Sequence, residues 1–195
     1  RRLLRSVVRR TGVAMADASG SYAVQHLPEW MAKSSFDFAA WRRMWVEQNP
    51  RNDRADLARL VMFVENARVI EREGVPGSLA ELGVYKGTTA KLLHTLFPGR
   101  TLWLFDTFEG FASVDAKDGG FSAKGDYATS TGYEATLEKL LDIHEAFCPV
   151  SHKKKFQLIK GDASVTVKQW LSDNPSAIIG MAIFDMDVYK PTRDV

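Results

Sequence analysis

Apolar residues follow two alternating periods along this chain from residue 54 onward. A helical stripe over residues 54–72 places one set of side chains on a single face: Leu57, Leu60, Val61, Val64, Ala67 and Ile70. Short apolar runs after it predict strands at 78–82, 101–105, 156–159 and 177–184. Helical periods between these runs predict helices at 88–96, 133–147 and 164–174. The alternation predicts an α/β fold, a Rossmann-like parallel sheet flanked by helices.

The segment before this alternation, residues 1–54, shows no strand pattern and is predicted to form a helical extension. Aromatic and methionine side chains crowd between Trp30 and Trp45, which favours core packing or a contact within a homo-oligomer; an aromatic platform for the substrate is the alternative. Residues 55–195 are predicted to form the Rossmann-like domain. The chain lacks an initiating Met and ends just after the fourth predicted strand, so we expect the C-terminal strands of the sheet to be absent from it; an unusually small sheet is the alternative.

Composition narrows the classes of partner. Lys and Arg total 26 against 24 acidic residues, a formal charge of +2, which gives no electrostatic argument for nucleic acid. No apolar run approaches the roughly 18 residues of a membrane span, so none is predicted. Cys148 is the single cysteine and has no partner for an internal disulfide. This fits a reducing, cytoplasmic setting.

The turn after the first predicted strand contains the first candidate site. Glu81 ends the strand, Gly83 and Gly87 turn the chain, and Thr88 opens the next helix. Glycines let a backbone approach a ligand closely, and a helix N-terminus offers free N–H groups. The spacing E-x-G-x-x-x-G differs from that of dinucleotide sites, and Glu81 would repel a pyrophosphate. An acid there can instead accept hydrogen bonds from an ammonium group, which favours S-adenosylmethionine; an ordinary tight turn is the alternative.

Two further strand ends carry acids. Asp106, followed by Thr107, ends the second strand, where a ribose diol can donate two hydrogen bonds to the carboxylate. Asp162, followed by Ala163, comes after the third strand and can accept a hydrogen bond from the amine of adenine. Taken alone, Asp162 also suits the N-cap of the next helix. Acids at three successive strand ends predict one pocket for an adenosine-bearing cofactor.

Asp185 and Asp187 follow the fourth strand. In an extended segment their side chains point the same way, because side chains alternate with a period of two. Two converging carboxylates repel each other unless a cation or a proton lies between them, and Mg²⁺ suits such oxygen ligands. One carboxylate can then bind the metal while the other removes a proton from a substrate hydroxyl. A pair of solvated turn acids is the alternative.

Five motifs follow one another along the chain: Glu81-Leu-Gly-Val-Tyr-Lys-Gly87, Leu104-Phe-Asp-Thr-Phe-Glu-Gly110, Gly125-Asp-Tyr127, Lys160-Gly-Asp162 and Asp185-Met-Asp-Val-Tyr-Lys-Pro-Thr192. In this order and spacing they resemble the macrocin O-methyltransferase family over about residues 55–192. The resemblance implies an S-adenosylmethionine- and Mg²⁺-dependent enzyme that methylates hydroxyls of sugars in natural products. Its partner would be a small-molecule, glycosylated acceptor.

The same resemblance implies roles for individual residues. Glu81, Gly83 and Asp106 would hold the cofactor, with Asp162 near its adenine. Asp185 would be a metal ligand and Asp187 the general base. The family supplies further metal carboxylates from a later segment, before which this chain ends, so the resemblance leaves the metal site incomplete and activity of this chain open.

The connection at residues 107–130 is long for a link between a strand and a helix, and long loops of this kind are commonly lids or binding loops. Phe108 and Phe111 are candidate apolar contacts for the substrate, with Asp126 or Tyr127 as polar ones; a disordered loop is the alternative. Two other functions stay open. One is a non-catalytic or truncated Rossmann-like cofactor-binding module, and the other is a nicotinamide-dependent oxidoreductase.

Overall fold

The computed structural model describes residues 13–18, 21–26, 40, 43, 54–120 and 122–195. The chain divides into two units, Arg1–Glu65 and Asn66–Val195. The basic segment 1–10 and most of the aromatic segment between Trp30 and Trp45 lie outside the described residues. Within the part of the chain that the structure describes, no helix is long and apolar enough to cross a membrane.

The first unit contains an antiparallel hairpin that the sequence analysis missed. Strand β1 (Val13–Ala18) pairs with β2 (Ser21–His26), and Met15 lies opposite Val24. We predicted helix throughout residues 1–54, and this part of that prediction is wrong. The apolar positions of β1 alternate with alanines rather than with polar residues, so the period of two that marks a strand is nearly invisible in its sequence.

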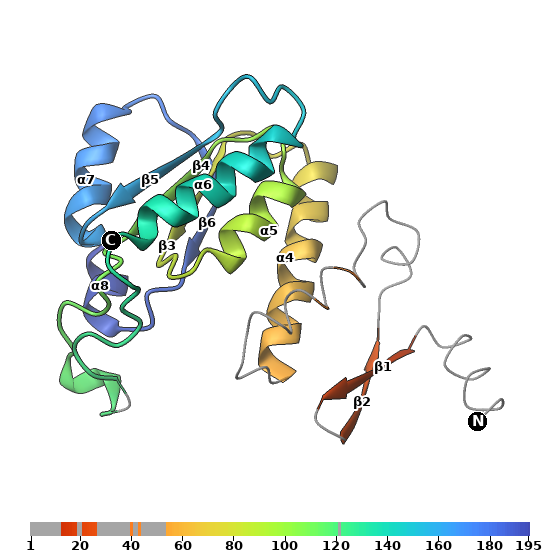
Figure 1. Cartoon of the computed structure of the whole chain (residues 1–195), viewed down its shortest axis with the longest axis horizontal. Coiled ribbons are helices and arrows are strands. Elements are labelled where there is room, and N and C mark those ends of the chain that lie inside the picture. Colours follow the sequence, from red (N-terminus) through yellow and green to blue (C-terminus); the bar gives the residue numbers. More distant parts are fainter. Residues whose placement is uncertain (1–12, 19–20, 27–39, 41–42, 44–53, 121) are drawn as a thin grey trace. The chain divides into compact units, whose positions relative to one another are not determined.

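Helix α4 (Arg54–Arg72) begins and ends where its apolar stripe predicts, and it leads from the first unit into the second. The turn after it contains Gly74 at φ +61°, a left-handed conformation that suits glycine at the end of a helix. Beyond this turn the chain enters the parallel sheet (Figure 1).

The second unit is built on a four-stranded parallel sheet in the order β5-β4-β3-β6. The strands are β3 (Ser78–Leu82), β4 (Leu102–Asp106), β5 (Phe156–Lys160) and β6 (Ile179–Phe184). The chain runs outward from β3 to β5 and then returns to place β6 on the other side of β3. The strand order therefore reverses at the β3–β6 boundary, where open α/β sheets bind their ligands.

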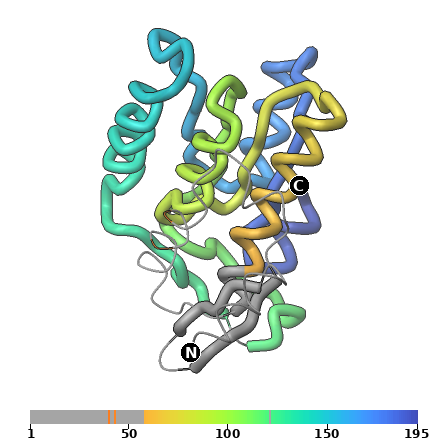
Figure 2. The backbone as a smooth tube through the Cα atoms, turned by 90° about the vertical axis from the view of Figure 1, so that its right-hand side faces the viewer, coloured from red at the N-terminus to blue at the C-terminus, as the bar shows by residue number. Residues whose placement is uncertain are grey.

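Helices cover both faces of this sheet, as predicted. They are α5 (Thr88–Leu96), α6 (Tyr133–Ala146) and α7 (Ala163–Asp173), while the short α8 (Tyr189–Asp194) follows β6 and contacts α7. Figure 1 shows α5 and α6 side by side in front of the strands, and the side view of Figure 2 places α6 and α7 on opposite sides.

Alternate side chains of each strand form the two halves of the core. The ring of Trp170 in α7 packs against Trp103 at 5.0 Å and Phe105 at 6.1 Å, measured between ring centroids. On the other face His94 of α5 meets Phe156 edge-on at 5.9 Å. The strands are thus apolar on both sides, which is typical of a parallel sheet between two helical layers and fixes the orientation of every strand end.

Candidate functional site

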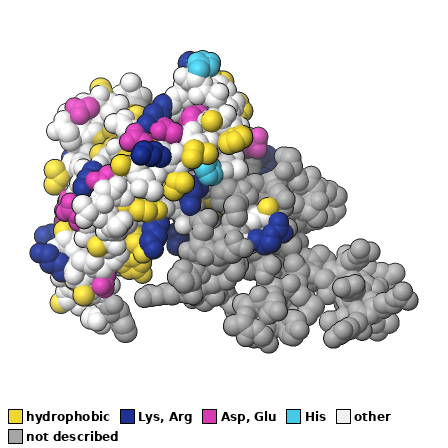
Figure 3. Space-filling model, in the orientation of Figure 1, with side chains coloured by type: hydrophobic (Ala, Val, Ile, Leu, Met, Phe, Trp, Pro, Cys, Tyr) yellow, Lys and Arg dark blue, Asp and Glu magenta, His cyan; other side chains and the backbone are white. Residues whose placement is uncertain are grey.

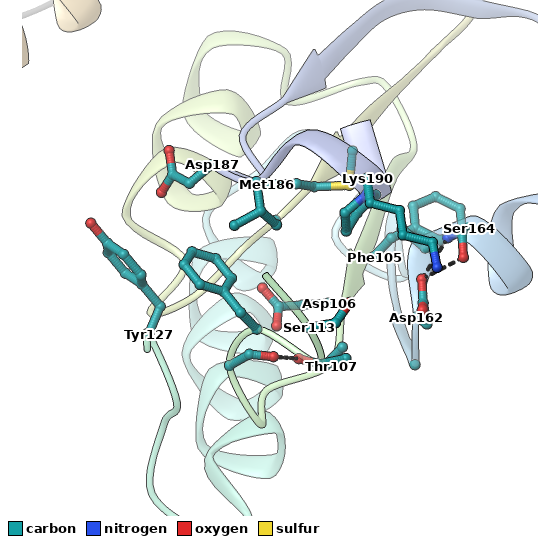
Figure 4. A pocket seen from close by; sticks show the side chains of 18 of the residues that line it. Phe105, Asp106, Thr107, Ser113, Tyr127, Asp162, Ser164, Met186, Asp187 and Lys190 are labelled. Atoms are coloured by element: carbon teal, nitrogen blue, oxygen red, sulfur yellow. Dashed lines mark hydrogen bonds between the residues drawn. The ribbon is translucent and has the colours of Figure 1, made fainter. Parts of the chain in front are cut away.

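A pocket lies at the carboxyl ends of the strands, where the sequence analysis expected one. It encloses about 920 Å³, its open mouth included. Seven predicted site residues line it: Gly83, Asp106, Thr107, Asp162, Ala163, Asp185 and Asp187. In Figure 4, Asp187 and Tyr127 lie on one side of the pocket and Asp162 and Ser164 on the other, with Asp106 and Thr107 between them. Four separate strand ends thus contribute to one cavity.

Asp106 organises the backbone around the base of this pocket. Its Oδ2 accepts hydrogen bonds from the backbone N–H of Val84 at 2.6 Å and of Tyr85 at 2.7 Å. Its Oδ1 accepts one from Phe108 N–H at 2.6 Å. A carboxylate has about four acceptor positions, so one position, on Oδ1, is left for a ligand. We expected Asp106 to accept two hydrogen bonds from a ribose diol. With three positions occupied by backbone N–H groups, it can accept only one unless the backbone rearranges.

Gly83 brings the ends of β3 and β6 together at the point where the strand order reverses. Its φ is +90°, and a Cβ at this position would overlap the backbone carbonyl of Asp185 and lie 2.7 Å from its carbonyl carbon. Gly83 N–H also donates to Phe105 O at 2.9 Å, and Asp185 N–H donates to Leu82 O at 2.8 Å. Only glycine fits this conformation and this approach.

Asp162 is the N-cap of α7, the role that its sequence position suggests. Its Oδ1 accepts both the backbone N–H of Ser164 at 2.9 Å and the hydroxyl of Ser164 at 2.7 Å. Within the described residues no hydrogen bond to Oδ2 is found, so this oxygen can still accept one from a ligand in the pocket. Capping and ligand binding are therefore compatible at this residue.

The segment that carries Asp185 and Asp187 is a tight turn and not an extended strand. Strand β6 ends at Phe184, Asp187 has φ +57°, and Val188 N–H donates to Met186 O at 2.7 Å. The expected alternation of side chains therefore does not apply here, because it requires extended backbone. Both carboxylates still line the pocket, Asp185 half-buried and Asp187 exposed.

The donor set at this turn suits a hard cation. Mg²⁺ is usually held by one or two protein carboxylates and keeps several waters, and two partly solvated carboxylates match that pattern. Asp194 of α8 lines the same pocket and forms an ion pair with Arg193.

Comparison with known proteins identifies the family. The sequence profile described as Macrocin-O-methyltransferase (TylF) matches residues 22–194. The chain belongs to the macrocin O-methyltransferase family. This confirms the resemblance drawn from the motifs and assigns the protein to the O-methyltransferases.

Solved structures agree with this assignment. The crystal structure of CalS11, a calicheamicin methyltransferase, matches with a TM-score of 0.59 and 27% identity, covering 92% of this chain and 77% of that chain. The apo structure of CalS11, described as a TDP-rhamnose 3'-O-methyltransferase of calicheamicin biosynthesis, matches with a TM-score of 0.52 and 27% identity, covering 86% and 66%. A search of curated proteins found no significant match.

Three residues predicted to hold the cofactor lie outside the lining of the pocket in this O-methyltransferase. Glu81 is buried at the end of β3, with 1% of its surface exposed. Gly87 is the left-handed N-cap of α5, and a Cβ there would overlap Cδ1 of Leu137. Thr88 is the first residue of α5. The structure therefore gives Gly87 a packing role between α5 and α6.

Helix α8 contributes to the pocket in a way that was not predicted from the sequence. Lys190, Pro191 and Asp194 line the pocket, although no helix was predicted after β6. The signal was present but short, because proline near the start of a segment favours the first turn of a helix. The helix has six residues, too few for a clear apolar period.

An aromatic cluster borders the pocket beside Asp187. The Tyr127 ring packs edge-on against Tyr85, with centroids 5.4 Å apart, and also lies 5.4 Å from Phe111. Tyr85 and Tyr127 have φ values of +51° and +60°. Phe108 and Asp187 share this left-handed conformation, and two of these four residues, Tyr127 and Asp187, line the pocket. Backbone strain of this kind concentrates at functional sites.

A second cluster of candidate ligands lies elsewhere, between α5, α6 and β5. His94, Glu145 and Cys148 are the three side chains, among the described residues, that approach one another closely enough to share a metal ion. The two ring nitrogens of His94 face different partners, however: Nε2 lies 3.0 Å from Glu145 Oε2, and Nδ1 lies 3.7 Å from Cys148 Sγ. Lys155 also forms an ion pair with Glu145. We therefore interpret the cluster as a buried polar network.

Ionisation in this network fits that interpretation. Burial raises the pKa of Glu145, but hydrogen bonds from Lys155 and His94 outweigh it, so the pKa lies below its ordinary value. Burial and the nearby Glu145 carboxylate raise the pKa of the Cys148 thiol, which opposes a nucleophilic role.

On the face seen in Figure 3, basic and acidic side chains are interspersed across the described part of the chain.

Proposed function

We propose that this chain is an S-adenosylmethionine-dependent O-methyltransferase that acts, with Mg²⁺, on a hydroxyl of a sugar or a sugar-bearing natural product. The observation that carries the proposal is the single cavity that joins Asp106 and Asp162 to Asp185 and Asp187. The family assignment supports methyl transfer, and the likeness to CalS11, named as a TDP-rhamnose methyltransferase, supports a sugar acceptor.

The residues on the Asp106 side fit an adenosine-bearing cofactor. Asp106 Oδ1 and Asp162 Oδ2 each keep an acceptor position, which suits one ribose hydroxyl and the adenine amine. The backbone of Gly83 and the side chains of Thr107 and Ala163 complete this part of the lining. Residues 55–195 would thus hold the cofactor site, with buried Glu81 supporting the turn that forms it.

The residues on the other side fit an acceptor and a divalent cation. When bound, the cofactor supplies an electrophilic methyl group, and Mg²⁺ supplies a Lewis acid. Asp185 would hold the metal, and Asp187, which is exposed in the pocket, would accept the proton of the acceptor hydroxyl at its carboxylate. The rings of Tyr127 and Phe111 would orient the acceptor, since positioning is a large part of the rate of such transfers.

Calorimetric titration tests the cofactor half of the proposal. S-adenosylmethionine and S-adenosylhomocysteine are titrated into the chain, with Mg²⁺ and with a chelator. We expect Asp106→Ala to weaken binding by about tenfold or more, because it removes the acceptor and frees three backbone N–H groups. Asp173→Ala is the matched control: it removes an exposed carboxylate of α7 that bonds Gln169 and does not line the pocket.

Turnover separates a working enzyme from a binding module. TDP-rhamnose is the first acceptor to test, with methyl gain followed by mass spectrometry. Binding of the cofactor with methyl gain that stops on chelation supports the full proposal. A folded wild-type chain that binds neither form of the cofactor would contradict it. Binding without transfer to any of a panel of sugar acceptors would favour the non-catalytic alternative.

A further inference from the structure

One carboxylate, Asp118, ties the long loop between β4 and α6 (residues 107–132) to the turn that carries Asp187. Asp118 lies in a short 3-10 helix, Ala116–Asp118, within that loop. Its Oδ1 accepts the backbone N–H of Tyr189 at 2.7 Å, although the two residues are 71 positions apart in the chain. Its Oδ2 accepts the backbone N–H of Asp115 at 2.7 Å. Both oxygens are thus engaged, one by each segment.

The loop end of this connection is itself fixed. Asp115 and Asp118 form a reciprocal capping box, in which Asp115 Oδ1 also accepts Lys117 N–H at 3.0 Å. Such a box holds the side chain of Asp118 in a defined direction. A second contact lies beside it, where Lys117 Nζ donates to the Tyr189 hydroxyl at 2.8 Å.

The other end of the connection lies close to the predicted base. Tyr189 is the first residue of α8 and comes two residues after Asp187. Asp187 stands in a left-handed turn closed by the Val188 N–H to Met186 O hydrogen bond. The first N–H groups of a helix have no acceptor within the helix, so the carboxylate of Asp118 acts as the acceptor for the N–H of Tyr189. Asp118 therefore holds the turn at Asp187 from a different segment of the chain.

The geometry points to Asp118 as a positioning residue for methyl transfer, an inference that rests on the proposed function. Asp118 does not line the pocket; it acts through Tyr189 on the orientation of Asp187. The loop that it fixes also supplies Phe111 and Tyr127, so one hydrogen bond sets the base and the aromatic side of the pocket relative to each other. A displacement of about 1 Å in such a site can cost about a hundredfold in rate.

Hydrogen exchange gives a readout that needs no substrate. In Asp118→Ala we expect the amide of Tyr189 to exchange at least about tenfold faster than in the wild type, because its acceptor is lost. Tyr189→Phe is the matched control: it removes the hydroxyl that accepts from Lys117 Nζ, keeps the ring that Lys117 Nζ also contacts, and leaves the backbone hydrogen bond to Asp118 intact. In this variant the backbone amide of residue 189 should exchange at the same rate as in the wild type.

Kinetics then distinguish positioning from a purely structural role. We expect Asp118→Ala to lower kcat by about 10- to 100-fold, with the melting temperature and the affinity for S-adenosylmethionine close to wild type. Asp118→Asn keeps one acceptor oxygen and should recover part of kcat. Tyr189→Phe should keep most of it.

Three outcomes would overturn the inference. They are unchanged exchange at Tyr189 in Asp118→Ala, faster exchange with unchanged kcat, and cofactor affinity that falls in proportion to kcat in both Asp118 variants. An inactive wild type is a different result: it contradicts the proposed function itself, whatever the variants do. The wild-type assay therefore comes first and separates the two failures.

Discussion

Gly83 at the end of β3 lies directly against the backbone of Asp185 at the end of β6. A Cβ on Gly83 would be 2.7 Å from the Asp185 carbonyl carbon and 3.1 Å from Met186 N. These are backbone atoms of the turn after β6, which the hydrogen bond from Asp185 N–H to Leu82 O holds against β3, so they have no rotamer by which to move away. The position of Asp185 in the pocket therefore depends on the absence of a side chain at residue 83.

Gly83→Ala should destabilise the protein and displace Asp185. The left-handed backbone alone costs about 1–2 kcal/mol for alanine, and the overlap with the backbone of Asp185 adds to it. Gly74→Ala is the matched control, because Gly74 has φ +61° but a Cβ there meets no atom within 4 Å. Urea denaturation of the two variants measures the difference. Equal losses of stability would show that the contact with Asp185 is unimportant.

Gly87→Ala should act through packing and not through cofactor affinity. Its Cβ would overlap the side chain of Leu137, which is fully buried. Leu137→Ala creates space at the same place, so in a double-mutant cycle we expect the two changes to be less harmful together by about 1 kcal/mol. Strictly additive effects, or a loss of S-adenosylmethionine affinity in a stable Gly87→Ala protein, would contradict this role.

Lys155→Met should be strongly destabilising near neutral pH. It leaves the buried Glu145 carboxylate without its ammonium partner, a change that typically costs about 3–5 kcal/mol. Lys154→Met is the matched control, since Lys154 pairs with Glu138 at the surface and such pairs contribute less than about 1 kcal/mol. Thermal or urea unfolding compares the two. A similarly small loss of unfolding free energy in both variants would show that Lys155 does not stabilise a buried Glu145 carboxylate.

The pH dependence of this pair has a definite sign. Because the fold lowers the pKa of Glu145 from 4.5, its contribution to stability is complete above pH 4.5 and is lost as pH falls through the lowered value. The difference in unfolding free energy between wild type and Lys155→Met should therefore shrink under acid conditions. A difference that grows on acidification would mean that the sign of the shift is wrong.

Tyr127→Ala should weaken binding of the acceptor and leave binding of the cofactor unchanged. It removes the ring that packs against Tyr85 and Phe111 beside Asp187, so we expect KM for the acceptor to rise about tenfold. Tyr127→Phe keeps the ring and should stay near wild type. Phe147→Ala is the control, because Phe147 is 87% exposed and does not line the pocket. A fall in S-adenosylmethionine affinity in Tyr127→Ala would contradict this division of the pocket.

Most of the second unit could be predicted from the sequence because its strands and helices have strong periods. Helices α4 and α5 and strand β3 have the bounds predicted, and the other strands and long helices differ by one or two residues at their ends. The common cavity of Asp106, Asp162, Asp185 and Asp187 followed from the same reasoning, since parallel strands end at one edge of the sheet.

The features that could not be predicted depend on contacts between distant residues. Nothing in the local sequence shows that Asp106 is engaged by Val84, Tyr85 and Phe108, or that Asp118 bonds Tyr189. The left-handed turn at Asp187 was missed for the same reason: φ is set there by packing against neighbouring segments.

The strand order also has a consequence for how the molecule folds. Leu79 of β3 pairs with Leu102, which is near in sequence, and with Met181, about a hundred residues later in the chain. Closing a longer loop costs more chain entropy, so the pairing of β6 is expected to come after that of β3 with β4. The part of the pocket around Asp106 can then form early in folding. The acidic turn that would perform the chemistry is completed in the last step.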